Sequence, residues 1–190
     1  MSEGRLEGAR AVIGAVLCGG ASRRMGSPKP GVRWRGEPMA SLVADALIAG
    51  GCAEVIAVGG DPAVVEPLGL LLVPDTMPGE GPLPAVADAL RHAAGRAVMV
   101  VSCDVPQLAP LTVRRMLDGA SGGCAVTVAT TDRIEPLCAV WQQSALRDVE
   151  RAVASGGRLI RDVLRRLDAC LVAVPAADLR NVNTPGDLAD

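Results

Sequence analysis

One short stretch of the chain brings together residue types that bind phosphate. The segment AVIGAVLCGGASRRMGSPKPG (residues 11–31) is an apolar run that stops at two glycines and continues with Arg23, Arg24 and Lys29. Glycines let a ligand approach backbone N–H groups closely, and cations neutralise an anion held there. This combination suits a polyphosphate, although a Gly-Gly pair by itself is equally typical of a surface turn with solvated arginines.

Two well-known phosphate loops do not match this stretch. A P-loop requires G-x-x-x-x-G-K-[ST], but Gly26 is followed here by Ser27-Pro28-Lys29. The dinucleotide fingerprint G-x-G-x-x-G does not follow any apolar run of the sequence. Lys29 is the only lysine of the chain, which otherwise uses arginine. This choice indicates a need for a compact point charge at that position.

Polar residues follow other apolar runs. Asp104 ends the run AVMVVSCD, and Asp75 follows LLLV after one proline. Such carboxylates can hold Mg²⁺ beside phosphates, or act as helix N-caps and turn residues. Asn181 and Asn183 supply neutral hydrogen-bonding groups in a turn, where Asx-turn chemistry is the alternative.

The surrounding sequence predicts the elements that position these residues. Short apolar runs, typical of buried parallel strands, alternate with stretches of helical period. The runs are 11–17, 54–59, 70–73, 97–102, 125–129, 137–141 and 170–174. Helical spacing follows Pro38, Gly81-Pro82 and Leu159, and Asp61-Pro62 and Thr184-Pro185 have the form of helix starts. We therefore expect a single domain (1–190) with a three-layer α/β/α sandwich and a Rossmann-like, mainly parallel sheet. In such folds, ligands bind at the carboxyl ends of the strands.

Composition excludes several classes of function. The formal net charge is -2 and the pI is near 5.5, so the chain has no electrostatic footprint for nucleic acid or an anionic membrane. Phe and Tyr are absent, which argues against base stacking on aromatic platforms. No apolar run approaches the ~20 residues of a membrane span, and AVIGAVLC is too short and wrongly flanked for a lipoprotein signal.

The cysteines do not form a recognisable pattern. There are six, with no C-x-x-C pair, and most lie in or beside apolar runs. We expect them to be buried thiols, with neither a disulfide framework nor a zinc site, in the reducing cytoplasm.

The glycine-rich stretch and three companions resemble one known family. L-C-G-G-A-S-R-R-M-G-S-P-K (17–29) resembles the L-A-G-G-x-S-x-R-M-G-x-x-K signature of the MobA-like nucleotidyltransferases. P-D-T-M-P-G-E-G-P-L (74–83), S-C-D-V-P (102–106) and N-V-N-T-P (181–185) follow in the expected order. Together the segments cover nearly the whole chain. The resemblance implies a fold of the nucleotide-diphospho-sugar transferase type.

The resemblance also implies roles for particular residues. Asp104 would hold Mg²⁺, and Lys29, Arg24 and Asp104 would be catalytic. Asn181 and Asn183 would lie on the acceptor side, and we expect Glu135-Pro136 there as well. Gly81-Pro82-Leu83 would contact the guanine base through backbone groups and a leucine lid. The nucleotide-binding set would be Leu17, Cys18, Gly19, Gly20, Ala21, Arg23, Lys29, Asp75, Gly81, Pro82, Leu83 and Asp104.

The implied reaction is nucleotidyl transfer. GMP would pass from GTP to the phosphate of molybdopterin, with release of pyrophosphate and with Mg²⁺ as cofactor. Transient contacts with other cofactor-biosynthesis proteins or with molybdoenzymes would follow. A CTP-using relative, or one with another phosphate acceptor, is the alternative. The chain departs from the family pattern at three places. Cys18 replaces the usual alanine, Pro84-Ala85 replaces Ala-Gly, and Gly59-Gly60 stands where some members have an asparagine. An inactive nucleotide sensor and a purely structural module explain the co-occurrence of Lys29, Asp75 and Asp104 less well.

Overall fold

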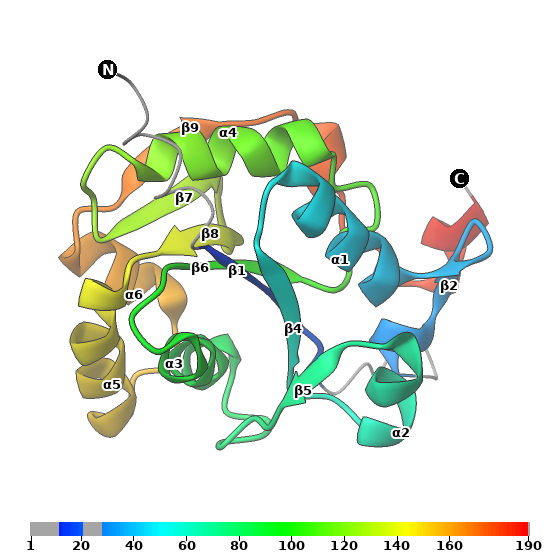
Figure 1. Ribbon diagram of the computed structural model, residues 1–190, viewed down its shortest axis with the longest axis horizontal. Coiled ribbons are helices and arrows are strands. Elements are labelled where there is room, and N and C mark those ends of the chain that lie inside the picture. The colour runs from blue at the N-terminus through cyan, green and yellow to red at the C-terminus, as the bar shows by residue number, and fades with distance from the viewer. Residues whose placement is uncertain (1–11, 21–27, 190) are drawn as a thin grey trace.

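The computed structural model describes residues 12–20 and 28–189, and its centre is a seven-stranded sheet (Figure 1). The strand order is β5-β4-β1-β6-β8-β7-β9. The strands are β1 (Ile13–Leu17), β4 (Glu54–Val58), β5 (Leu71–Val73), β6 (Val98–Ser102), β7 (Val126–Thr130), β8 (Ile134–Trp141) and β9 (Cys170–Ala173). Every neighbouring pair is parallel except the two that involve β8, which runs antiparallel to β6 and β7.

Helices cover both faces of this sheet, as Figure 1 shows with the sheet between two helical layers. One layer contains α1 (Met39–Gly50) and α4 (Pro110–Ala120). The other contains α3 (Pro82–Ala93), α5 (Leu146–Ala154) and α6 (Ile160–Arg166). A short helix, α2 (Pro62–Val65), precedes β5, and β2 (Arg33–Trp34) and β3 (Glu37–Pro38) form a separate small hairpin. The fold is the three-layer sandwich that the sequence predicted.

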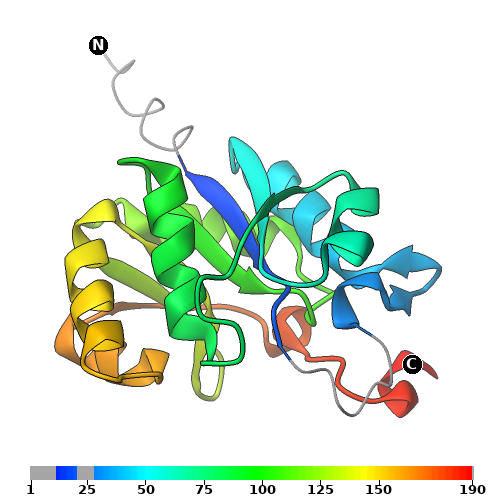
Figure 2. The same cartoon turned by 90° about the horizontal axis from the view of Figure 1, so that it is seen from below.

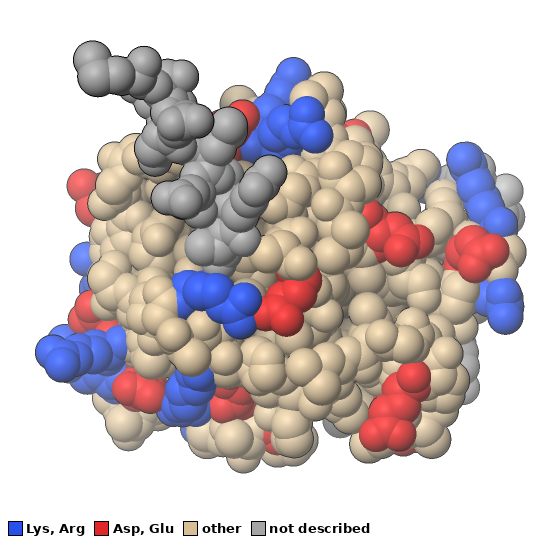
Figure 3. Space-filling view, viewed as in Figure 1, with Lys and Arg blue, Asp and Glu red and all other residues tan. Residues whose placement is uncertain are grey.

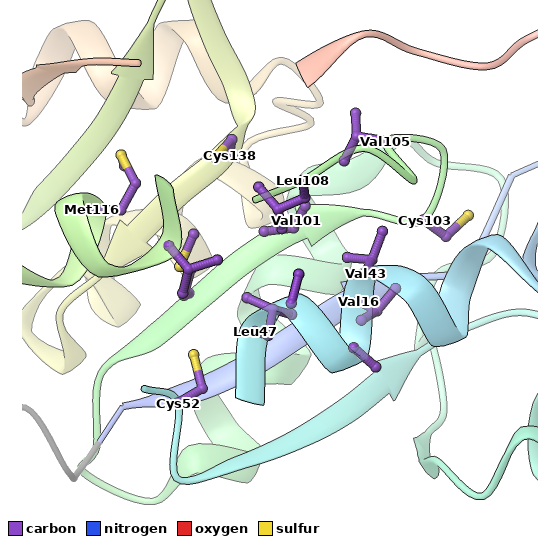
Figure 4. Close-up of a cluster of buried hydrophobic side chains, with 14 of the residues drawn as sticks. Val16, Val43, Leu47, Cys52, Val101, Cys103, Val105, Leu108, Met116 and Cys138 are labelled. Carbon is purple, nitrogen blue, oxygen red and sulfur yellow. The ribbon is translucent and has the colours of Figure 1, made fainter. Parts of the chain in front are cut away.

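The core is aliphatic and tightly packed. Figure 4 shows Val43 and Leu47 of α1 lying against Val16 and Val101 of the central strands, and all four side chains are fully buried. The helices of this layer also approach each other closely, because a Cβ on Gly50 would lie 2.4 Å from Cβ of Val113. Branched aliphatic side chains at this density fix the strands, and with them the loops at their carboxyl ends.

Two predicted details need correction. Asp61 caps α2 as expected, with its side chain accepting from the N–H of Ala63 at 2.9 Å. Thr184-Pro185, however, begins only a short 3₁₀ helix (Pro185–Ala189), and the Thr184 hydroxyl donates to Asp187 instead of capping. The reversed direction of β8 was also not predicted. It brings the amino end of β8 to the carboxyl edge of its neighbours.

The prediction that the chain has no disulfide is wrong. Cys124 and Cys170 are bonded, with their Cα atoms 6.0 Å apart and a sequence separation of 46. Cys124 lies two residues before β7, and Cys170 opens β9, where it lies opposite Thr127. Because the sequence does not reveal that β7 and β9 are neighbours, it could not pair these cysteines.

The charged residues on the face in view are of mixed sign. Figure 3 shows basic and acidic side chains interspersed on that face. In the described ranges, no helix is both long enough and apolar enough to cross a bilayer.

The disulfide generates a stability prediction. In the chain-entropy model, a bridge across 46 residues stabilises the fold by up to about 4 kcal/mol. Reducing agent should therefore lower the midpoint of urea unfolding of the wild type. The Cys124→Ser/Cys170→Ser double variant should start at the lower midpoint and not respond to reductant. Equal midpoints for oxidised and reduced wild type would contradict the prediction.

Candidate active site

Three segments distant in sequence meet at Lys29. The Lys29 ammonium, at the start of a 3₁₀ turn after the glycine loop, donates to Asp104 Oδ2 at 2.8 Å and to Asn183 Oδ1 at 2.5 Å. The side chains of Lys29 and Asp104 are only 19% and 13% exposed. Lys29 therefore links the loop after β1, the end of β6 and the C-terminal segment. The sequence predicted that residues of these three segments lie together.

The C-terminal segment is held at this point by more than one contact. The N–H of Val182 donates to the carbonyl of Asp104 at 2.8 Å, and the Val182 side chain packs with Trp34 and Met39. In Figures 1 and 2 the C-terminal segment, drawn red, lies beside the β2–β3 hairpin. The hairpin and its tryptophan thus form the support on which the asparagine segment lies.

Asp104 has the chemistry expected of a magnesium ligand. Its Oδ2 accepts from Lys29, whereas Oδ1 is buried and has no hydrogen-bond partner in the structure. In the ranges that the structure describes, no three His, Cys, Asp or Glu side chains cluster as a dedicated metal cage would. Mg²⁺ needs no such cage when phosphates are present, since one or two carboxylates and phosphate oxygens suffice. The single unpaired oxygen of Asp104 fits that mode of binding.

The glycine loop presents backbone to a ligand. Leu17 and Cys18 are buried, and their backbone groups bond to Cys103 and Val58, so their side chains cannot contact a nucleotide. Gly20 has φ +128°, a conformation that glycine adopts readily. The remaining predicted loop residues, Ala21, Arg23 and Arg24, lie outside the described residues.

Asp75 lies against the same loop. Its Oδ2 is 3.5 Å from the position that a Cβ of Gly19 would take. Gly59, with φ +68°, comes just as close, because a Cβ there would lie 3.1 Å from Cβ of Asp75. The ends of β1, β4 and β5 therefore converge, and the Gly59-Gly60 departure from the family pattern leaves room for the Asp75 side chain.

A buried carboxylate that the sequence did not reveal fixes the Asp75 loop. Asp88 on α3 accepts from the N–H of Thr76 at 2.9 Å and from its hydroxyl at 3.0 Å. Arg91 neutralises Asp88 at 2.8 Å and also reaches Glu150 of α5. Asp88 is a positioning residue, and only the tertiary contact between α3 and the loop identifies it.

The start of α3 contradicts part of the predicted base site. Gly81 is the N-cap residue with φ 90°, and Pro82 follows at the first helical position, as predicted. Leu83, however, is 0% exposed and belongs to the core beneath α3. Its side chain cannot cover a base, so the predicted leucine lid is wrong, and of the three predicted residues only Gly81 is exposed.

The neighbourhood of Gly81 includes an arginine that the sequence analysis missed. The carbonyl oxygen of Arg158 lies 3.4 Å from the position that a Cβ on Gly81 would take. The Nε of Arg158 donates a hydrogen bond to Glu80 at 2.6 Å. Arg158 also donates to the carbonyls of Val153 and Gly157. These contacts link the loop before α6 to the loop before α3.

Asp187 holds the asparagine turn. Its Oδ2 accepts from the N–H of Asn183 at 2.9 Å and from the N–H of Thr184 at 2.8 Å. These hydrogen bonds, the one from Asn183 first, lower the pKa of the Asp187 carboxyl below its usual value. The T-x-x-D spacing, which is that of half a capping box, could have identified it.

A cavity of about 320 Å³ opens beside Asp104. The pairing of β8 with β7 is irregular here. Adjacent residues of β7, Val128 and Ala129, pair with Ala139 and Glu135, so residues 136–138 of β8 have no partner in β7. These three residues line the cavity. Its lining is Ser102, Asp104, Val105, Arg133, Glu135, Pro136, Leu137, Cys138, Arg161, Leu179 and Asn181. Asn181, Glu135 and Pro136 therefore line one cavity, whereas Asn183 binds Lys29.

Thiols close to the site are kept neutral. A hydrogen bond with Cys18 and burial raise the pKa of Cys103 well above its ordinary value. Burial raises the pKa of Cys138 to about 12. Both thiols are therefore neutral at neutral pH.

Comparisons with known proteins identify the family of the chain. The family model described as the MobA-like NTP transferase domain matches residues 14–170. A probable molybdenum cofactor guanylyltransferase from Deinococcus radiodurans is 34% identical, with 93% of this chain and 91% of that protein covered. One from Pelotomaculum thermopropionicum is 33% identical, with 92% and 89% covered.

Solved structures have the same fold. Molybdopterin-guanine dinucleotide biosynthesis protein A from Archaeoglobus fulgidus superposes with a TM-score of 0.77 at 28% identity, covering 93% of this chain and 95% of that one. Rv0371c from Mycobacterium tuberculosis superposes with a TM-score of 0.76 at 21% identity, covering 94% and 96%, and supports the fold alone.

The Lys29–Asp104 pair predicts a pattern of stabilities. Lys29→Met should lower the free energy of unfolding by about 1–3 kcal/mol, because it leaves a largely buried carboxylate without its cation. Adding Asp104→Leu should recover most of that loss, since the unpaired charge is then removed. Urea unfolding of the four proteins of this cycle measures the coupling. Additive losses would show that the two side chains do not interact.

Asp187 predicts a pH dependence. Its folded pKa is depressed, so its contribution to stability is complete above the unfolded pKa near 4 and disappears as pH falls through the lower folded value. Asp187→Asn should therefore be less stable than wild type at pH 7, and the difference should shrink in acid. Thermal unfolding from pH 7 to pH 3 measures this. A difference that is constant over that range would contradict the role of the carboxylate.

Proposed function

Because the chain belongs to the MobA-like NTP transferase family, and is thus a nucleotidyltransferase, we propose that it transfers GMP from GTP to the phosphate of molybdopterin. It is then a molybdenum cofactor guanylyltransferase, the name borne by its relatives in Deinococcus and Pelotomaculum. The observation that carries the proposal is the Lys29–Asp104 contact, which joins the glycine loop to the edge of the cavity. A nucleotide on one side and a phosphate acceptor on the other would meet at this pair.

The chemistry requires alignment more than activation. An oxygen of the acceptor phosphate forms a bond to the α-phosphorus of GTP, the bond to the α–β bridging oxygen breaks, and pyrophosphate leaves with that electron pair. An anionic phosphate nucleophile needs no general base, so no catalytic histidine is required. Lys29 neutralises phosphate oxygens as negative charge moves to the leaving group, and the backbone of Gly19 and Gly20 orients the triphosphate.

We propose Mg²⁺ as the cofactor, bound through the unpaired Oδ1 of Asp104. When bound, Mg²⁺ screens the charge of the phosphates and orients them. Asp75 then serves the ribose side of the nucleotide, because it lies against Gly19 and its Oδ1 is held by the N–H of Met77 at 2.9 Å. Arg23 and Arg24 add positive charge from the loop.

Guanine is the preferred base in this proposal. Gly81, which precedes α3, is exposed and can present its backbone to the base, and the names of the relatives agree. The CTP-using alternative has no specific support here. We also propose a cytoplasmic location, where GTP is available. A reducing compartment would keep Cys124 and Cys170 as thiols for part of the time.

Pyrophosphate release tests the proposed function. Purified protein with Mg²⁺, molybdopterin and GTP should release pyrophosphate, and CTP, ATP and UTP should give at least about tenfold lower rates, because the base site is built for guanine. Asp104→Asn should reduce the rate by a factor of about 10² or more, since it removes a charge that acts on the reacting phosphates.

A substitution at the exposed residue Leu159 provides the control. Leu159 is exposed, so Leu159→Gln should leave the rate unchanged. Faster release with CTP than with GTP would replace the base assignment. If no nucleotide gave pyrophosphate release in the presence of molybdopterin, the assignment of molybdopterin as the acceptor would be wrong.

A further inference from the structure

Two arginines separate the cavity at Asp104 from a second, larger one. The second cavity has a volume of about 520 Å³ and lies between α6 and the β7–β8 hairpin. Its lining is Val128, Arg133, Ile134, Arg161, Leu164, Arg165, Asp168, Ala169 and Leu171. Arg133 and Arg161 line both cavities, so the two hollows lie on either side of these side chains.

The sheet divides the site into a nucleotide side and an acceptor side. Gly19, Gly59 and Asp75 lie at the ends of β1, β4 and β5, whereas the smaller cavity lies over the ends of β6 and β8. Asp104, at the end of β6, stands between the two halves. An acceptor whose phosphate reaches Asp104 must therefore extend past Arg133 and Arg161, toward the larger cavity.

The larger cavity combines positive charge with an apolar wall. Arg133, Arg161 and Arg165 line it together with one carboxylate, Asp168, and the exposed aliphatic side chains of the lining are Ile134 and Leu171. The cavity therefore suits a flat ring system whose face packs on aliphatic side chains, whose polar edge can reach Asp168, and which carries an anionic group.

The two shared arginines are differently held. Arg133 is oriented by Glu135, which accepts from its Nε at 2.9 Å, and that hydrogen bond raises the pKa of Arg133. Arg161 has no hydrogen bond or ion pair within the described part of the chain. A cation whose fork is not taken up by a carboxylate can bind an anionic ligand without first losing a partner.

We propose that Arg133 and Arg161 bind the ene-dithiolate end of molybdopterin, and that its pterin ring lies in the larger cavity. This rests on the proposed function and names the contacts that would select its acceptor. The terminal phosphate occupies the smaller cavity at Asp104, the anionic sulfur atoms lie between the arginines, and the ring packs against the aliphatic wall. Asp168 can accept from the amino group of the pterin.

Steady-state kinetics of single variants test this assignment. Arg161→Gln should raise KM for molybdopterin by about tenfold or more, as expected when a charged hydrogen bond to a ligand is lost. KM for GTP and kcat at saturating molybdopterin should remain close to wild type, because the nucleotide side is untouched. Arg166→Gln is the matched control, since Arg166 is on the same helix but lines neither cavity.

Binding of dephosphorylated molybdopterin shows which group Arg161 contacts. We expect Arg161→Gln to weaken binding of molybdopterin and of its dephosphorylated form by the same factor, measured by calorimetry without nucleotide. If the loss disappears with the dephosphorylated form, Arg161 binds the phosphate and the assigned contact is wrong.

Failure of this inference is distinguishable from failure of the proposed function. Wild-type turnover with unchanged KM and Kd for molybdopterin in Arg161→Gln would overturn the inference alone. Absence of pyrophosphate release by the wild type would overturn the function. Arg161→Lys keeps the positive charge but removes the planar guanidinium. If the guanidinium binds two sulfur atoms, this variant should also bind molybdopterin more weakly, and full activity of Arg161→Lys would refute that contact.

Discussion

The organisation of the site depends on one largely buried ammonium group. A cation with so little exposure is stable only when its hydrogen bonds are satisfied, and Asp104 from the middle of the chain and Asn183 from near its C-terminus provide two acceptors. This requirement brings the C-terminal segment to the end of β6, where the Val182 amide then binds the Asp104 carbonyl. The glycine loop, the carboxylate and the asparagines are thereby placed together before any ligand arrives. Such preorganisation is what a reaction between two anions needs.

The single reversed strand determines where the acceptor can go. In a fully parallel sheet, the amino end of β8 would lie at the opposite edge from Asp104. Because β8 is antiparallel to β6 and β7, Glu135 and Pro136 instead lie at the carboxyl edge of the neighbouring strands. Residues 136–138, which have no partner in β7, line the cavity there. The proposed nucleotide-binding half comes from regular β–α units, whereas the proposed acceptor half comes from this irregular strand, α6 and the C-terminal segment. In the proposed reaction, different parts of the fold would thus bind the two substrates.

Much of this could be predicted from the sequence, and the gaps have physical causes. Continuous β-branched runs identify strands such as Val98–Ser102, and their polar ends identify Asp75 and Asp104. The same runs carry no information on direction, so the reversal of β8 and the Cys124–Cys170 pairing were invisible. Leu83 was misassigned because a motif position does not say which way a side chain on the first helical turn points. Asp88 acts through its contact with the loop at Thr76, which periodicity does not report, and the position of Arg161 between two cavities depends on the packing of α6.

The choice between lysine and arginine follows the same division of the site. Lys29 must fit between a carboxylate and an amide in a nearly buried position, where a compact ammonium can turn its N–H bonds toward both. A guanidinium is planar and larger, and it would push Asp104 away from the glycine loop. At the open boundary between the two cavities the requirement is the reverse, because a broad fork can contact a wide anionic group from the side. Arg133 and Arg161 occupy that boundary. The distribution of basic residue types in this chain therefore follows from burial on one side of Asp104 and exposure on the other.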